Sequence, residues 1–310
     1  MLESFKIRYT KVSRNRTMAV RDKQGIIIPT PYNAARPGLG DRVAHLFSPK
    51  ADKEHYFDPY LRYFEASIPG SKLSTWTKES VNESPLLIRG LAKRCQEAMH
   101  YCWNNDKDFF AIDSAYFGNE TSKIKIWHRI TKNNLQNLTP IIDRPLDRLT
   151  RALPEYKYQK FKTGSKILIC PPSDKVMKFW NQPYQKEWTD IVIKELKLIT
   201  DRPIEVRLKP GRAERITYNT LSRALQEDVH CLVTYNSIAA IEALMHGVPA
   251  IALGPNAATT MCNTSLSEID NLNTYNEDEM IRYVSHLSYC QFHIDEMKDG
   301  TAWRMINESS

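Results

Sequence analysis

The sequence predicts an α/β protein made of two Rossmann-like lobes that face a cleft. Two observations predict this class. Short runs of β-branched residues alternate with amphipathic segments, which is typical of βαβ units and parallel sheets. A proline-containing, highly charged stretch near residues 140–162 separates two such series, so we divide the 310 residues into lobes 1–150 and 151–310.

The first lobe is expected to open with a strand, a glycine-rich loop and a helix. Gly25–Pro29 is short, β-branched and bounded by Gly and Pro, as buried strands are. The loop contains Gly38 and Gly40, and Asp41 can cap a helix that begins at Arg42. The pattern then predicts a helix over 86–103 and strands over 108–113 and 124–129.

The second lobe alternates more regularly. Gly247 suits the left-handed residue that ends a helix, after the segment 237–246. The predicted strands cover 165–170, 204–209, 229–234 and 249–253. The predicted helices cover 187–200, 215–226, 237–246, 278–286 and 294–306.

Composition excludes several classes of protein. Hydrophobic residues make up 42% and charged residues 25%, which excludes a mainly disordered chain. The longest apolar runs are far shorter than the roughly 20 residues that span a bilayer. The N-terminal segment is basic and lacks the apolar core of a signal peptide, so we expect a cytoplasmic protein. The six cysteines show no Cys-x-x-Cys spacing, so no zinc or redox site is expected.

The positive charge is concentrated in the first lobe. Residues 1–150 hold 24 Lys and Arg against 16 Asp and Glu, a net charge of +8, whereas residues 151–310 have a net charge of −1. A basic run over residues 6–23 includes Arg14 and Arg16. Such a surface attracts polyanions, including nucleic acid, by releasing their counterions. The plain alternative is a solvated basic face.

Polar residues follow two predicted strands of the second lobe. Asn236 and Ser237 lie where a strand gives way to a helix, and free N–H groups at such a position suit a phosphate. Glu242, a little over one turn later, could accept hydrogen bonds from a ribose diol. Lys209 and Arg212 follow another strand end, where cations would stabilise a diphosphate. The alternative is an ordinary βαβ unit with a buried Ser and Glu.

Three segments in the same order resemble the donor-binding lobe of nucleotide-sugar glycosyltransferases with the GT-B fold. The likeness is greatest to bacterial capsule polysaccharide transferases and to phage transferases that glycosylate DNA. The central segment is 230–254, with its Ser, Glu and Ala-Leu-x-x-Gly-x-Pro stretch. Residues 207–212 resemble a Lys-Pro-His-Pro segment, with Gly211 in place of His. Residues 289–303 resemble the C-terminal tail that crosses back to the first lobe.

The resemblance implies inverting, metal-independent transfer of a sugar from a nucleotide diphosphate, a UDP-sugar above all, with no cofactor. Asp113, at a strand end, is the first candidate for the base that deprotonates the acceptor, and Asp41 is the second. Gly38 and Gly40 would allow close approach to the donor. The alternatives to a catalytic role are that Asp113 is an ordinary turn residue and that Asp41 only caps a helix.

The acceptor-binding candidates lie in the basic first lobe: Arg14, Arg16, Tyr116, His128, Arg129 and Lys132. The residues near 127–134 mix aromatic, basic and amide side chains, which could stack on a base or bind a phosphate, or could simply form a strand edge. We expect duplex DNA that carries a hydroxymethylated pyrimidine as the acceptor. The alternatives are a polysaccharide or lipid-linked sugar, and a non-catalytic nucleic-acid-binding protein on the same fold.

Overall fold

The computed structural model describes residues 85–119, 125–211 and 220–308, together with shorter pieces. Those pieces are strands β1 (Arg8–Tyr9), β2 (Val20–Arg21), β3 (Ile27–Ile28), β4 (His45–Ser48) and β5 (Lys72–Thr75), and residues 60, 61, 63, 67, 68, 77, 214 and 218. Strands β1, β2 and β3 pair in antiparallel fashion, so the predicted strand at 25–29 is present in part.

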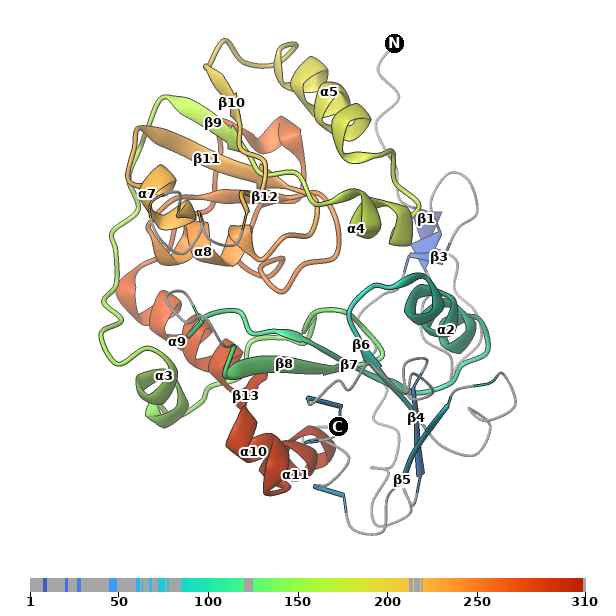
Figure 1. Ribbon diagram of the computed structural model, residues 1–310. Coiled ribbons are helices and arrows are strands. Elements are labelled where there is room, and N and C mark those ends of the chain that lie inside the picture. The colour runs from blue at the N-terminus through green and yellow to red at the C-terminus, as the bar shows by residue number, and fades with distance from the viewer. Residues whose placement is uncertain are drawn as a thin grey trace.

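The second half contains a parallel four-stranded sheet with the order β10-β9-β11-β12 (Figure 1). Its strands are β9 (Lys166–Ile169), β10 (Ile204–Val206), β11 (Val229–Thr234) and β12 (Ala250–Ala252). The helices between them are α4 (Asp174–Phe179), α5 (Gln185–Leu196), α7 (Leu221–Leu225) and α8 (Ala239–Met245). The predicted βαβ alternation is confirmed, and Gly247 has a φ of +66° after α8.

Helices cover both faces of this sheet, because successive residues of its strands direct apolar side chains to opposite faces and both faces are buried. Ile167 and Ile169 share a cluster with residues of α4 and α5. Leu168, between them, shares another cluster with residues of α7 and α8. A strand directs successive side chains to opposite faces, so a run without polar residues becomes the centre of a three-layer structure.

The first half contains a six-stranded mixed sheet with the order β13-β8-β7-β6-β4-β5. β6 (Leu86–Arg89) and β7 (Phe109–Ser114) run parallel to β4 and β5, whereas β8 (Trp127–Lys132) is antiparallel to both of its neighbours. α2 (Lys93–Asn104) covers one face, with Cys95, Ala98 and Met99 packed against Leu86 and Ile88.

The C-terminal segment returns to the first sheet. α9 (Glu277–Ser288) leads to β13 (Gln291–His293), which pairs with β8. α10 (Ile294–Lys298) and α11 (Thr301–Glu308) then pack under the sheet, where Met297 and Trp303 join Phe110 and Ile112 in one cluster (Figure 1). The predicted crossing back is therefore present, with the helix expected over 294–306 interrupted at Gly300, whose φ is +87°.

Two predicted elements of the first half are wrong. The helix expected from Arg42 is replaced by strand β4, and residues 41–44 lie outside the described residues. The helix expected over 86–103 begins with strand β6 and becomes helical only at Lys93. β6 is a short apolar run buried inside the sheet, and such a run looks alike in a strand and in a helix.

The two halves share apolar cores. One cluster joins Leu86 and Met99 of the first half to Phe179 and Val233 of the second. α3 (Asp147–Ala152) spans the division that the sequence predicts at residue 150. The division into two domains, and the two-lobed GT-B arrangement with its cleft, stay predictions.

Candidate functional site

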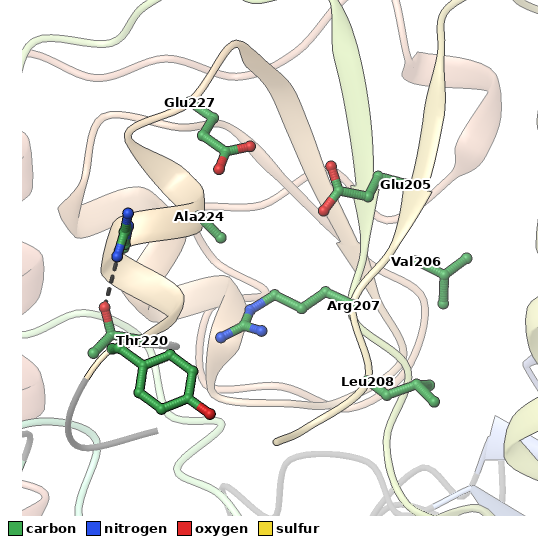
Figure 2. A pocket seen from close by; sticks show the side chains of 9 residues that line it. Glu205, Val206, Arg207, Leu208, Thr220, Ala224 and Glu227 are labelled. Carbon is green, nitrogen blue, oxygen red and sulfur yellow. Dashed lines mark hydrogen bonds between the residues drawn. The ribbon is translucent and has the colours of Figure 1, made fainter. Parts of the chain in front are cut away.

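A hollow of about 520 Å³ lies between the edge strand β10 and helix α7 (Figure 2). Arg207, directly after β10, extends its guanidinium toward α7 and Thr220. Tyr218 and Arg223 also line the hollow. At the other end, Lys166 pairs with Glu205 at 2.7 Å and also with Glu227. The hollow therefore offers cations and an aromatic ring beside the strand end.

Arg207 and Glu242 both affect the pKa of the buried Cys170 thiol. Burial raises the pKa of Cys170 to about 12, Arg207 opposes that rise, and Glu242 and Glu205 add to it. Cys170 directly follows β9, next to β10 in the sheet. Lys209 is exposed two residues further along the chain. A shared donor site for Lys209 and Glu242 stays a prediction.

The turn between β11 and α8 is held by side-chain hydrogen bonds. Thr234 Oγ1 donates to the Cys170 carbonyl at 2.7 Å, and Ser237 Oγ accepts from the Ala239 N–H at 3.2 Å. α8 begins at Ala239, so Asn236 and Ser237 precede the helix. Asn256 Nδ2 donates to the Ser237 carbonyl at 2.9 Å, which ties this turn to the loop after β12.

Gln136, from the first half, contacts both of these loops. Its Nε2 donates to the carbonyl oxygen of Asn236, and its Oε1 accepts from the Ala257 N–H at 3.1 Å. The side chain is buried. Sequence reasoning missed Gln136, because an amide in a polar stretch gives no signal that its partners lie 100 and 121 positions away.

Asp113 lies at the carboxyl end of β7, with its side chain half exposed. Arg129 Nη2 is 2.8 Å from Oδ2, and the Ser114 N–H donates to Oδ1 at 2.7 Å. Burial alone would raise the pKa of Asp113, but Arg129, the Ser114 N–H, Lys125 and Arg89 outweigh it and hold the pKa below its ordinary value. The carboxylate is therefore ionised at neutral pH and able to accept a proton or a hydrogen bond.

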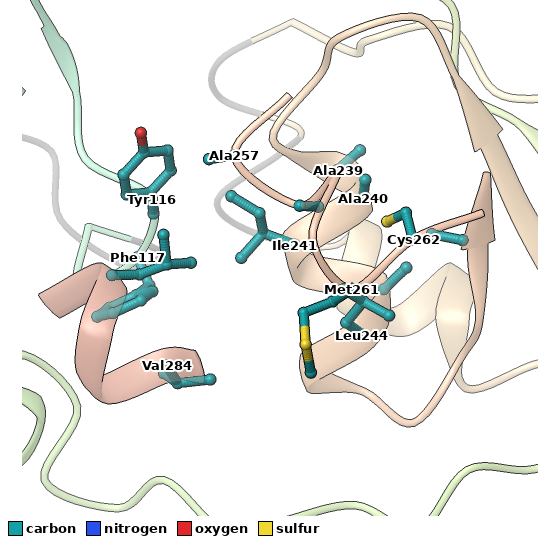
Figure 3. Packing of buried hydrophobic residues seen from close by; sticks show 14 of the residues in the cluster. Tyr116, Phe117, Ala239, Ala240, Ile241, Leu244, Ala257, Met261, Cys262 and Val284 are labelled. Carbon is teal, nitrogen blue, oxygen red and sulfur yellow. The ribbon is translucent and has the colours of Figure 1, made fainter. Parts of the chain in front are cut away.

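Loops from the carboxyl ends of the two sheets pack against each other (Figure 3). Tyr116 and Phe117, just after β7, share a cluster with Ile241 of α8 and with Ala257, which follows β12. Ligands of open α/β sheets bind beyond the carboxyl ends of the strands. The edges that could bind two substrates thus lie together.

Among the described acceptor-binding candidates, Arg129 and Tyr116 lie together, with the guanidinium carbon 5.5 Å from the centre of the Tyr116 ring, whereas Lys132 lies apart from them. Tyr116, His128 and Arg129 are buried; His128 is fully inaccessible, and burial lowers its pKa to about 4. Arg129 uses its guanidinium on Asp113 and on the carbonyls of Ser114 and Leu135. Lys132 lies at the far end of β8, since it is in register with Phe110 near the start of β7. The acceptor-binding roles of all four stay predictions.

Several candidates lie outside the described residues: Arg14, Arg16, Gly38, Gly40, Asp41 and Arg212. The sequence contains one Asp-x-Asp triplet, Asp106-Lys107-Asp108, a pattern that can hold a divalent metal. The expectation of metal-independent transfer did not take this triplet into account. It precedes β7, at the opposite edge from Asp113, and Asp108 accepts from Asn133 Nδ2 at 2.7 Å. Across the described part of the chain, no group of three or more His, Cys, Asp or Glu side chains could hold a metal ion.

No protein-family model and no curated protein matches the sequence. Among solved structures, Thermosulfurimonas dismutans KpsC, a beta Kdo 2,7 transferase, is similar at 13% identity with a TM-score of 0.46, over 86% of this chain and 99% of that chain. The beta Kdo 2,4 transferase KpsC of the same organism is similar at 13% identity and a TM-score of 0.46, over 80% and 94%. At these values the likeness carries no conclusion about activity. Within the described residues, no helix is both long and apolar enough to cross a membrane.

Proposed function

We propose that the chain is a glycosyltransferase that moves a sugar from a nucleoside diphosphate to a hydroxyl acceptor. The packing of the loop after β7 against α8 and the loop after β12 carries this proposal. The ionised Asp113 at the end of β7, and Arg207 and Lys209 after β10, support a site for one substrate at each sheet. A group transfer needs its two substrates to meet in this way.

The donor would bind at the second sheet. Arg207 and Lys209 supply positive charge beside the end of β10, where it would stabilise the diphosphate as it leaves. Glu242 would accept hydrogen bonds from the ribose hydroxyls. The aromatic ring of Tyr218, which lines the hollow at β10, would offer a surface for the nucleobase.

Asp113 would act on the acceptor. In an inverting transfer the acceptor hydroxyl loses its proton to a base while its oxygen attacks the anomeric carbon and the nucleoside diphosphate departs. Arg129 keeps Asp113 ionised and fixes its orientation. A carboxylate with a lowered pKa is a weak base, so its contribution depends on position more than on proton affinity.

For the acceptor we propose duplex DNA that carries hydroxymethylated pyrimidines. The uneven charge of the sequence supports this choice, with a net charge of +8 in residues 1–150. The basic run of residues 6–23 that would contact phosphates lies largely outside the described residues. A polysaccharide acceptor is the competing outcome of the test.

The test is a transfer assay with UDP-, GDP- and TDP-sugars against two acceptors, hydroxymethylated duplex DNA and an acidic polysaccharide. We expect release of nucleoside diphosphate and a mass increase of one sugar on the DNA. Transfer to the polysaccharide alone would replace the proposed acceptor and keep the glycosyltransferase. No transfer and no nucleotide binding, combined with tight DNA binding, would instead indicate a non-catalytic DNA-binding protein.

A further inference from the structure

We propose that Gln136 is a positioning residue for the donor site and couples that site to the first half of the chain. This inference rests on the proposed function, which assigns the donor to the second sheet; the loops that follow β11 and β12 lie at the carboxyl ends of the strands of that sheet. Gln136 holds one atom of each loop: the carbonyl oxygen of Asn236 and the N–H of Ala257.

The contact is specific for an amide. One end of the Gln136 side chain donates and the other accepts, which matches a carbonyl on one loop and an N–H on the other. Both loop atoms would lose their partner if the amide were replaced by a hydrocarbon. A buried polar group without a partner is costly, so the loops would move apart or admit water.

Gln136 also directly follows Leu135, whose carbonyl oxygen accepts a hydrogen bond from Arg129, the partner of Asp113. Arg129 Nε donates to the Leu135 carbonyl at 3.0 Å while Nη2 holds Asp113. One short stretch of chain thus contacts the base candidate's partner and, through the next side chain, the donor loops. A displacement of the first half would be transmitted to the donor site at this point.

Asn137 provides a matched control. It is the next amide along the chain, and it also reaches the second half, where Nδ2 lies 3.1 Å from His286 Nε2 and contacts Cys290. Its partners in the second half belong to α9 and the residues after it, and its Oδ1 accepts from Thr139, so none of its side-chain partners belongs to the donor loops. Loss of Asn137 therefore weakens the contact between the halves without releasing Asn236 or Ala257.

The experiment compares nucleotide binding by the parent, Gln136→Leu, Gln136→Glu and Asn137→Leu, using UDP, GDP and TDP in calorimetry. For the nucleotide that binds the parent, we expect Gln136→Leu to weaken binding about tenfold or more, the effect of unpairing a buried polar group. Asn137→Leu should change binding by less than about threefold, even if it lowers the melting temperature as much as Gln136→Leu does.

Gln136→Glu gives a signature that a purely structural role would not. An ionised Glu still accepts the hydrogen bond from the Ala257 N–H, but its second oxygen is repelled by the partially negative carbonyl oxygen of Asn236. A protonated Glu can donate a hydrogen bond to that carbonyl oxygen. Binding by this variant should therefore recover toward the parent's affinity as the pH falls from 8 to 5, relative to the parent at each pH.

Two results separate the failures. If the parent binds a nucleotide and both Gln136 variants bind it equally well at every pH, the positioning role is wrong and the proposed function stands. If the parent binds none of the nucleotides, the proposed function fails, and the positioning role fails with it. Should Gln136→Leu not fold, Gln136→Met, which is similar in volume, replaces it in the comparison.

Discussion

Arg129 Nη2 lies 2.8 Å from Asp113 Oδ2, across the antiparallel pair of β7 and β8. The two residues are opposite each other in register, so the pair is a direct consequence of how these strands align. The same guanidinium donates to the carbonyls of Ser114 and Leu135. Asp113 is therefore a fixed, ionised carboxylate at the carboxyl edge of the first sheet.

Asp113→Asn should abolish transfer and leave nucleotide binding intact. The amide has nearly the same shape but cannot take up the acceptor proton, and loss of a general base lowers kcat by about 10²–10⁴-fold. Steady-state rates and calorimetry on the same preparation check both parts. Turnover within about threefold of the parent would remove Asp113 from the reaction.

Lys209→Ala should weaken binding of a nucleoside diphosphate much more than binding of the free nucleoside, because only the diphosphate carries the charge that Lys209 would meet. Lys186→Ala is the matched control, since Lys186 is an exposed lysine on α5 that pairs with Asp190. Equal losses for both ligands would argue against a diphosphate role for Lys209.

Glu242→Ala should weaken nucleotide binding about tenfold, through loss of a charged acceptor for the ribose hydroxyls. Deoxyribose ligands give the sharper comparison. A 2′-deoxynucleotide should lose less affinity than the ribonucleotide on this substitution. Unchanged binding of both would mean that Glu242 does not contact the ribose.

Arg148→Met should destabilise the fold by up to about 3–5 kcal/mol, because it leaves the buried Glu296 carboxylate with the half-exposed Arg151 as its remaining cationic partner. Arg148 forms a two-pronged pair with Glu296 of α10, at 2.5 and 2.9 Å, and also donates to the carbonyls of Ser288 and Gln291. Arg282→Met removes an exposed pair with Asp143 and should cost less than about 1 kcal/mol. Urea unfolding measures the free energy of unfolding of both variants. Similar losses of stability would contradict the role assigned to the buried Arg148–Glu296 pair.

Stability should fall as the pH drops from about 6.5 to about 4. Burial lowers the pKa of His286 to about 4 from an ordinary value of 6.5, so below 6.5 the unfolded chain binds protons that the folded chain does not. Up to about 3 kcal/mol is lost in this way. His286→Asn should flatten the decline of melting temperature over this range, and an unchanged slope would contradict the assignment.

The second sheet was predictable from the sequence because most of its strands are short runs rich in apolar residues bounded by clear helix and turn signals, and the edge strand β10 alternates polar and apolar residues. β11 agrees with its predicted range residue for residue. The first half was harder. β13 has three residues and exists only through pairing with β8, some 160 positions earlier, and no local pattern reveals such a partner.

The positions of Asp113 at a strand end and of Glu242 in the first turn of a helix could be predicted from the sequence, and their roles stay predictions. The contacts that support these residues could not be predicted. The Asp113–Arg129 pair depends on strand register, and Gln136 depends on how the two halves meet. Both are tertiary facts. The same limit explains why Tyr116 and His128, chosen as ligand contacts, prove to be buried.

The most direct test of the account is calorimetric titration of the parent protein and of Lys209→Ala with UDP, GDP, TDP and CMP. The account predicts that the parent binds one nucleoside diphosphate selectively, and that Lys209→Ala weakens that binding while the protein melts at the same temperature. Absence of binding to every nucleotide at millimolar concentration, in a protein that is folded by its melting curve, would contradict a donor site in the second half.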